Sequence, residues 1–178
     1  MEKKQNETKE AVNPKRKKPT AIPEGTLIKV KSGFHGKLYY KNLVTQERVV
    51  WENFGETQVM TLRELRAMRT TQPAFFKNQW LIIVGVADGE DCEATPYEIC
   101  KCLVVTEYYK DFIDPDDFDL VCEWDENEIK CRIEMMAPGV RENLIIALNE
   151  YISSGRLDSI KKIKAFEKAL DCELRYHD

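Results

Sequence analysis

Residues 26–86 constrain the fold of this chain more than any other stretch, because they consist of short apolar segments separated by turn residues. The segments are rich in β-branched and aromatic residues, and some alternate between apolar and polar side chains, as strands do. They are 26–31, 37–41, 47–52, 57–60 and 79–86. Short antiparallel strands in succession predict a small curled sheet or a partly open barrel.

One short helix is predicted within this block. Thr61 and Glu64 have the spacing of a capping box, in which each residue bonds the backbone of the other. Three apolar residues follow at helical spacing, and Pro73 ends the segment. They are Leu62, Leu65 and Met68.

The last third of the chain predicts three helices. The first begins near Asp125 and stops before Pro138, and the second runs from about Val140 to a stop at Gly155. The third begins near Asp158 as its N-cap. Residues 95–103 fit either a short helix, with Pro96 at its first position, or an extended segment. Residues 111–119 favour a loop with a single turn, because Asp competes for local backbone donors.

Length and charge divide the chain further. With 178 residues it suits one ordinary domain, or one domain with a small appendage. Residues 1–20 carry seven basic and three acidic side chains, whereas residues 88–128 carry fifteen acidic side chains and two lysines. We therefore predict an α+β protein in four parts. They are a flexible basic arm (1–23), a small β-barrel-like module with one short helix (24–87), an acidic connecting region (88–124) and a helical region (125–178).

The N-terminal arm is predicted to be disordered, because it has almost no bulky apolar side chains with which to offset the entropy of ordering. Its basic cluster could contact phosphates or an acidic protein surface. The cluster consists of Lys15, Arg16, Lys17 and Lys18. The alternative is a solubilising tail that contacts nothing specific. We expect the arm to be protease-sensitive in the free protein and protected in an assembly.

One nuclease-like pattern occurs in the acidic region. Pro115-Asp116 followed by Glu128-Ile129-Lys130 has the loose PD…(D/E)xK spacing of metal-dependent nucleases. In those enzymes the second carboxylate and the lysine project from one strand, so that residues two apart point the same way. Here the second half predicts a capped helix, on which they diverge. A solvated acidic surface is the favoured interpretation.

The aspartates and the cysteines each allow a metal-site interpretation. Four aspartates suggest a Ca²⁺ loop, but Asp119 stands where an EF-hand needs Gly and Asp125 where it needs Glu. A loose cation site is the remaining alternative. The six cysteines lack paired C-x₂-C spacing, and the chain has only two histidines, so small buried side chains are favoured over a zinc site. We expect no catalytic residue, metal or cofactor. With no signal-peptide pattern at the N-terminus, we expect a reduced, intracellular setting.

Aromatic side chains lie beside basic ones in the predicted sheet and could form a face on which nucleic-acid bases stack. They are Lys37, Tyr39, Tyr40, Lys41, Arg48 and Trp51. Because strand side chains alternate, only half of them can point outwards. We name Tyr39, Tyr40 and Trp51 as candidate contact residues beside the basic cluster of the arm.

Two phrases resemble small virion structural proteins of tailed bacteriophages. The first is WENFGETQVM at 51–60, followed by a short helix and PAFF at 73–76, and the second is GRLDSIKKIKAFE at 155–167. The resemblance implies a capsid, neck or tail component that packs against its neighbours and catalyses no reaction. It transfers no site residues.

The expected function is therefore that of a non-enzymatic structural or adaptor protein in a larger assembly. The expected partners are other copies of the chain or other virion proteins, with weak nucleic-acid contact through the arm and no membrane contact. The expected location is the virion, after synthesis in the host cytoplasm. The alternative is a nucleic-acid-binding regulatory protein that uses the basic arm and the aromatic sheet face.

Overall fold

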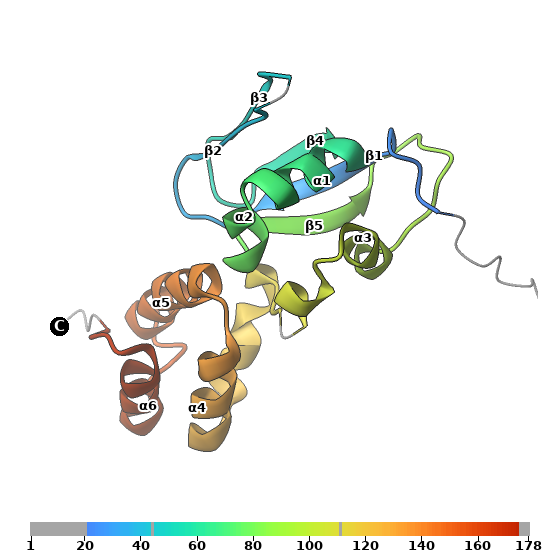
Figure 1. Ribbon diagram of the computed structural model, residues 1–178. Coiled ribbons are helices and arrows are strands. Elements are labelled where there is room, and N and C mark those ends of the chain that lie inside the picture. Colours follow the sequence, from blue (N-terminus) through green and yellow to red (C-terminus); the bar gives the residue numbers. More distant parts are fainter. Residues whose placement is uncertain (1–20, 44, 111, 175–178) are drawn as a thin grey trace, which may run out of the picture.

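The computed structural model describes residues 21–43, 45–110 and 112–174 (Figure 1). The basic cluster at Lys15–Lys18 lies outside the described residues. Antiparallel strands come first and helices follow, so the α+β prediction is confirmed. The strands are β1 (Leu27–Ser32), β2 (Leu38–Lys41), β3 (Arg48–Trp51), β4 (Thr57–Thr61) and β5 (Leu81–Val86).

The strands form two small sheets and not a closed barrel, so the barrel-like prediction is wrong. β1 lies between β4 and β5 in an antiparallel sheet, and β2 pairs only with β3 in a separate hairpin. Closure would require the hairpin strands to pair with the edges of the first sheet, but in the described chain they pair with each other. A helical layer covers one face of the first sheet. Figure 1 shows α1 (Leu62–Thr71) lying over this sheet, roughly along β1 and β4.

The predicted helix after β4 is confirmed, together with its cap. The Thr61 hydroxyl accepts a hydrogen bond from the Glu64 backbone N–H, and the Glu64 carboxylate accepts one from the Thr61 backbone N–H. A single turn, α2 (Ala74–Lys77), then places Phe75 and Phe76 in the core. The fifth strand starts later than predicted, because Gln79 has a positive φ of 55° and interrupts the extended chain.

The acidic region contains more helix than predicted. Of the two alternatives for residues 95–103 the helix is correct, since α3 (Pro96–Leu103) begins at a proline and is capped by Thr95. The 3₁₀ turn η1 (Thr106–Tyr109) follows α3. A longer 3₁₀ helix, η2 (Pro115–Glu123), replaces most of the predicted loop, because the Asp114 side chain caps it by accepting from the Asp116 N–H.

The three C-terminal helices are α4 (Glu126–Met135), α5 (Pro138–Ser153) and α6 (Ile160–Leu170). Asp125 caps α4 as predicted, and Gly155, with a φ of 74°, follows the end of α5. The first residues of two of these helices differ from the prediction. α5 begins at Pro138, whose fixed φ suits the first helical turn. Ser159, not Asp158, caps α6.

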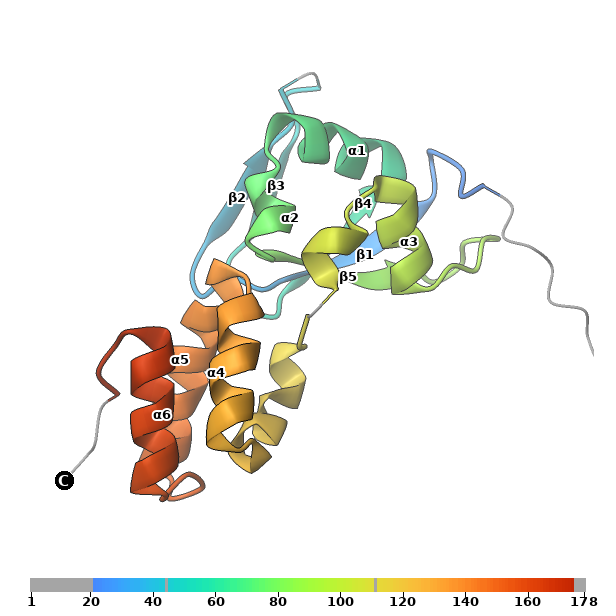
Figure 2. The same cartoon turned by 60° about the horizontal axis from the view of Figure 1, so that its bottom comes forward.

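Two separate cores hold the molecule together. The first runs from Ile28 to Val105 and includes α3, and the second runs from Phe118 to Leu174 and includes η2. The predicted connecting region (88–124) is therefore shared between the two cores. Figure 2 shows the helical unit attached below the sheet unit, with the start of α5 reaching towards the sheet.

Candidate binding cleft

A cleft of about 870 Å³ lies beside β5, on the side where α3 and η1 pack. One wall is formed by strand residues and the other by one side of a helix. The main lining residues are Ile82, Ile83 and Val84 of β5 and Pro96, Tyr97 and Cys100 of α3. Because most of these side chains are apolar, the cleft suits an apolar group better than a highly charged one.

An ion cluster closes one end of the cleft. The Lys31 ammonium lies 3.0 Å from an Asp114 carboxylate oxygen and 2.9 Å from one of Asp116. Burial by itself would lower the pKa of Lys31, but the hydrogen bonds and charges of Asp116 and Asp114 outweigh it and raise that pKa overall. Lys31 therefore stays charged at neutral pH and ties β1 to the start of η2.

Two titratable side chains within the cleft wall are inert. Burial raises the pKa of the Cys100 thiol to about 11, so it stays protonated and is a poor nucleophile at neutral pH. Burial, and to a smaller degree the nearby Cys100, raises the pKa of Tyr109 well above its usual value. The Tyr109 hydroxyl donates a hydrogen bond to the backbone carbonyl of Leu81 on β5. These groups position the wall and carry no reactive charge.

The sheet face opposite α1 continues the apolar surface beyond the cleft. Leu27 is 39% exposed, Val59 47% and Val84 44%, one from each strand of the sheet. Lys29 of β1 pairs with Val59 of β4 on one side and with Gly85 of β5, next to Val84, on the other. Leu27, Val59 and Val84 therefore surround the aliphatic stem of Lys29. We call Leu27, Val59 and Val84 the open-face residues.

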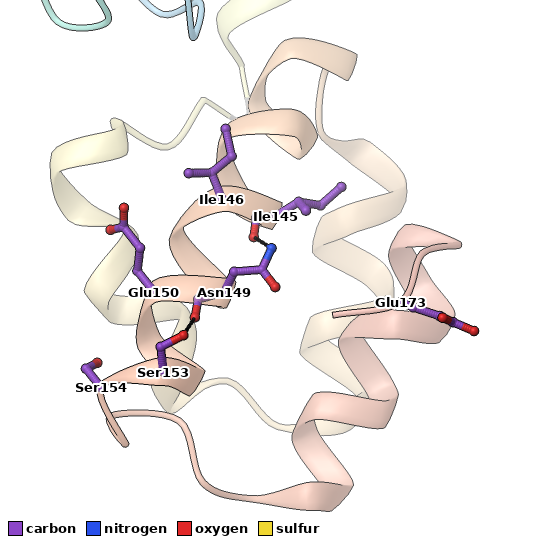
Figure 3. A pocket seen from close by; sticks show the side chains of 7 residues that line it. All are labelled: Ile145, Ile146, Asn149, Glu150, Ser153, Ser154 and Glu173. Atoms are coloured by element: carbon purple, nitrogen blue, oxygen red, sulfur yellow. Dashed lines mark hydrogen bonds between the residues drawn. The ribbon is translucent and has the colours of Figure 1, made fainter. Parts of the chain in front are cut away.

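A second hollow of about 770 Å³ lies along the outer side of α5. Figure 3 shows Ile145, Ile146, Asn149 and Ser153 lining it from one helix. The polar groups bond their own helix, since the Asn149 amide donates to the Ile145 carbonyl at 2.9 Å and the Ser153 hydroxyl to the Asn149 carbonyl at 2.7 Å. The Asn149 amide N–H and the Ser153 hydroxyl are therefore engaged within the helix.

The three candidate aromatic contact residues do not all point to the surface. Tyr39 is 45% exposed, whereas Tyr40 is 1% exposed and Trp51 is fully buried. Alternation turns Tyr40 inwards, and the Trp51 indole N–H points at the Val30 carbonyl, 3.5 Å away. Tyr40 and Trp51 are thus core residues and not contact residues, and the proposed stacking face loses both. The contact role of Tyr39 stays a prediction.

The acidic patterns of the sequence form structural contacts. Glu128 caps α4 and pairs with Arg132 at 3.2 Å, and Asp116 pairs with Lys31, so the nuclease-like residues act in separate places. Asp119 accepts from Tyr151 and Arg156. Among the described residues, no group of three or more His, Cys, Asp or Glu side chains is placed to hold a metal ion. The six cysteines form no disulfide.

Sequence reasoning missed Tyr97 and Val84, which line the cleft from opposite walls. Tyr97 is 68% exposed because it follows Pro96 in the first turn of α3, on the side away from the core. Val84 is exposed at a β-bulge, since Lys29 pairs with Gly85 and Val30 with Ile83. Gly85 within an apolar run was the signal that could have revealed the bulge.

No helix in the described part of the chain is both long enough and apolar enough to cross a bilayer. With the fold and the cleft defined, the chain was compared with protein-family models, curated proteins and solved structures. None of the three comparisons found a match.

Proposed function

We propose that this chain is a non-enzymatic structural or adaptor protein that works through protein–protein contacts within a larger assembly. The observation that carries the proposal is the row of open-face residues beside the cleft. A one-sided antiparallel sheet normally presents polar side chains to water. Here each strand presents an aliphatic side chain instead, and grouped exposed apolar side chains are typical of interaction surfaces.

The charges around the cleft support the same proposal. Lys31 is engaged by Asp114 and Asp116, and Lys29 is paired with Asp88 at 2.7 Å. Catalysis needs a nucleophile, acid or base that is free to meet a substrate. These groups instead hold one segment of the chain against another. The surface is suited to binding a partner.

We assign the assembly to the virion of a tailed bacteriophage on the strength of the two phrases described above. In the fold, WENFGETQVM covers the end of β3, the turn after it and most of β4. GRLDSIKKIKAFE covers the connection from α5 to α6 and most of α6. The first phrase includes Val59 of the open face, which links the resemblance to the proposed contact surface.

The proposal is tested by purifying the tagged chain from its native source and measuring its stoichiometry in particles. We expect the chain to sediment with particles at a fixed copy number. Val59→Lys, which places a charge on the open face, should reduce this incorporation. Ile160→Lys is the matched control, because Ile160 is 63% exposed on the helical unit. A chain that sediments free of any assembly would contradict the proposal.

A nucleic-acid-binding regulatory protein is the second candidate, supported by one surface of α6. Lys161, Lys164 and Lys168 are all exposed and lie on one side of the helix at the i, i+3 and i+7 positions. Such a row can neutralise phosphates and would make binding steeply salt-dependent. Filter binding of duplex and single-stranded DNA over a salt series, with and without residues 1–20, decides between the two candidates. Strong, steeply salt-dependent binding would favour the second: binding that the deletion abolishes would assign the contact to the arm, and binding that survives it would assign the contact to the α6 lysines.

A further inference from the structure

The cleft lies on the outer face of the three-stranded sheet, which is the face turned away from α1. Thr57 of β4, Lys31 of β1 and Ile82 of β5 are directly paired residues, and all three line the cleft. Residues paired across neighbouring strands point to the same face of a sheet. The floor of the cleft is therefore a row across three strands, and Val84, one of the open-face residues, extends it along β5.

One wall of the cleft is aromatic. Tyr97 of α3 lines it with a largely exposed side chain. Phe112, which follows η1, packs edge-to-face on Tyr109, with the two ring centroids 5.8 Å apart. Proline and aliphatic side chains pack well on aromatic rings that line a groove. The wall therefore suits a short apolar segment.

The rim of the cleft carries more negative than positive charge. Its charged lining consists of Glu107, Asp114 and Asp116 against Lys31 and Lys110. Lys31 bonds both aspartates, yet the Asp116 side chain is still 78% exposed and can accept a second cation. The stretch that supplies this wall, residues 88–128, has fifteen acidic side chains and two lysines. An occupant should therefore place basic residues directly beside its apolar ones.

We propose that the basic arm of a neighbouring copy of this chain occupies the cleft. Within the arm, Val12 and Pro14 lie immediately before the basic cluster Lys15–Lys18. These two side chains fill the space between the sheet and the aromatic wall, and the basic cluster meets the carboxylates of the rim. The proposal rests on the assembly function above and names the contact that joins one copy to the next.

The length and origin of the arm suit a contact between copies. Twenty residues precede Ala21 and can span up to about 65 Å when extended. The arm leads into the start of β1, whereas Lys31, which holds the ion cluster, lies near the end of that strand (Figure 1). To reach its own cleft, the chain would have to reverse its direction before β1. The cleft of a neighbouring copy requires no such reversal.

Fluorescence polarisation of a labelled synthetic peptide of residues 1–20, titrated with the full chain, tests the occupant. We expect saturable binding that weakens about tenfold or more when serine replaces the four residues of the basic cluster in the peptide. Tyr97→Ala and Asp116→Asn in the chain should each weaken binding about fivefold or more. Tyr39→Ala and Asp117→Asn are the matched controls, exposed residues outside the cleft lining, and should change affinity less than twofold. Circular dichroism checks that all variants fold.

Photo-crosslinking identifies the copy that supplies the arm. A benzophenone amino acid in place of Val12 of the full chain should produce a band of two chains in particles, with the crosslink mapping to α3 or η1. A crosslink within one chain or to a different protein overturns the contact, as does peptide binding that Tyr97→Ala leaves unchanged.

A third outcome separates this contact from the second candidate function. A peptide that binds DNA and not the chain overturns the arm contact and favours nucleic-acid binding. Each of the overturning results leaves the proposed assembly function standing if the chain still sediments with particles at a fixed copy number.

Discussion

Val104 closes α3 in a backbone conformation that valine seldom adopts. Its φ of 56° and ψ of 46° are left-handed, and its side chain is 72% exposed. A β-carbon in this region costs about 1–2 kcal/mol, and few packing contacts compensate for it here. Glycine is the usual residue at such a helix end.

Val104→Gly should therefore raise the free energy of unfolding by about 0.5–1 kcal/mol, because relief of this strain outweighs the extra freedom of glycine in the unfolded chain. Urea unfolding at equilibrium measures the difference. Val59→Gly is the control, since Val59 is a similarly exposed valine in strand β4, where glycine is unfavourable. Val59→Gly should lower stability, and equal effects from both substitutions would contradict the argument.

Asp119 joins η2 to α5 and the loop after it. One of its oxygens accepts from the Tyr151 hydroxyl at 2.8 Å, and the other lies 2.7 Å from the Arg156 guanidinium, which also stacks over the Tyr151 ring. The bonds from Arg156 and Tyr151 lower the pKa of Asp119 below its usual 3.8. The ionised form is therefore favoured in the folded protein.

Because folding lowers the pKa of Asp119, its ionised carboxylate stabilises the folded protein fully above pH 3.8. This stabilisation is lost as the pH falls through the lower pKa that Asp119 has in the folded protein. Asp119→Asn should lower the melting temperature at neutral pH, and the gap from the unmodified protein should close below pH 3.8. Thermal unfolding of both proteins over a pH series measures this difference in melting temperature. Asp117→Asn changes an exposed neighbour on η2 and is the control; it should leave the dependence of melting temperature on pH unchanged. A melting-temperature difference between Asp119→Asn and the unmodified protein that is the same at every pH would refute the role of the charge.

At the scale of elements, the first turn of α5 packs closely against the sheet unit. A β-carbon on Gly139 would lie 2.3 Å from the Asn78 carbonyl oxygen and 2.8 Å from the Trp80 ring. Both distances are too short for real contacts, and the nearer atom is backbone. Gly139 therefore permits this helix to approach the sheet.

Gly139→Ala should destabilise the protein by about 1–3 kcal/mol as an overpacked contact, although the same change within a helix ordinarily stabilises. The Trp80 fluorescence should change with it, because the indole lies at the contact. Gly25→Ala is the control, since a β-carbon there meets nothing within 4 Å. Unchanged urea unfolding and emission in Gly139→Ala would show that the helix end can shift freely.

At the scale of the molecule, one buried hydrogen bond joins the two cores. The Asn143 amide of α5 donates to the Gly33 carbonyl at 2.7 Å, and Asn143 is only 3% exposed. The Lys31 ion cluster provides the second link, between β1 and the start of η2. The hydrogen bond and the ion cluster thus add to the close contact at Gly139 in holding the helical unit on the sheet unit.

Asn143→Ala should lower the free energy of unfolding by about 1–3 kcal/mol, because the Gly33 carbonyl would be left buried without that donor. Hydrogen exchange should show faster opening near Gly33 as well as in α5. Asn127→Ala, an exposed asparagine in the first turn of α4, is the control and should change stability little. Loss of protection in α5 alone would mean that the bond does not couple the two cores.

The helices and strands of this chain were largely predictable, because their signals lie within a few residues. The Thr61 and Glu64 pair and the position of Asp125 marked helix starts that the structure confirms. A few local signals were misassigned, such as the cap of α6, which is Ser159 and not Asp158.

The larger errors arose where contacts between distant segments decide the outcome. Whether strands close into a barrel depends on edge pairing. The inward turn of Tyr40 and Trp51 depends on distant partners, Phe75 of α2 for Tyr40 and the Val30 carbonyl of β1 for Trp51.

Most local elements and the caps of α1 and α4 were thus determined by the sequence alone, because the hydrogen bonds that start a helix join residues two to four apart. Only the tertiary structure decided where the cleft lies and which groups line it. Lys31 and Asp114, which close the cleft, are 83 positions apart, and Asn143 and Gly33 are 110 apart. Contacts at such separations leave no periodic signal in a single sequence, because the chain between them can take many paths.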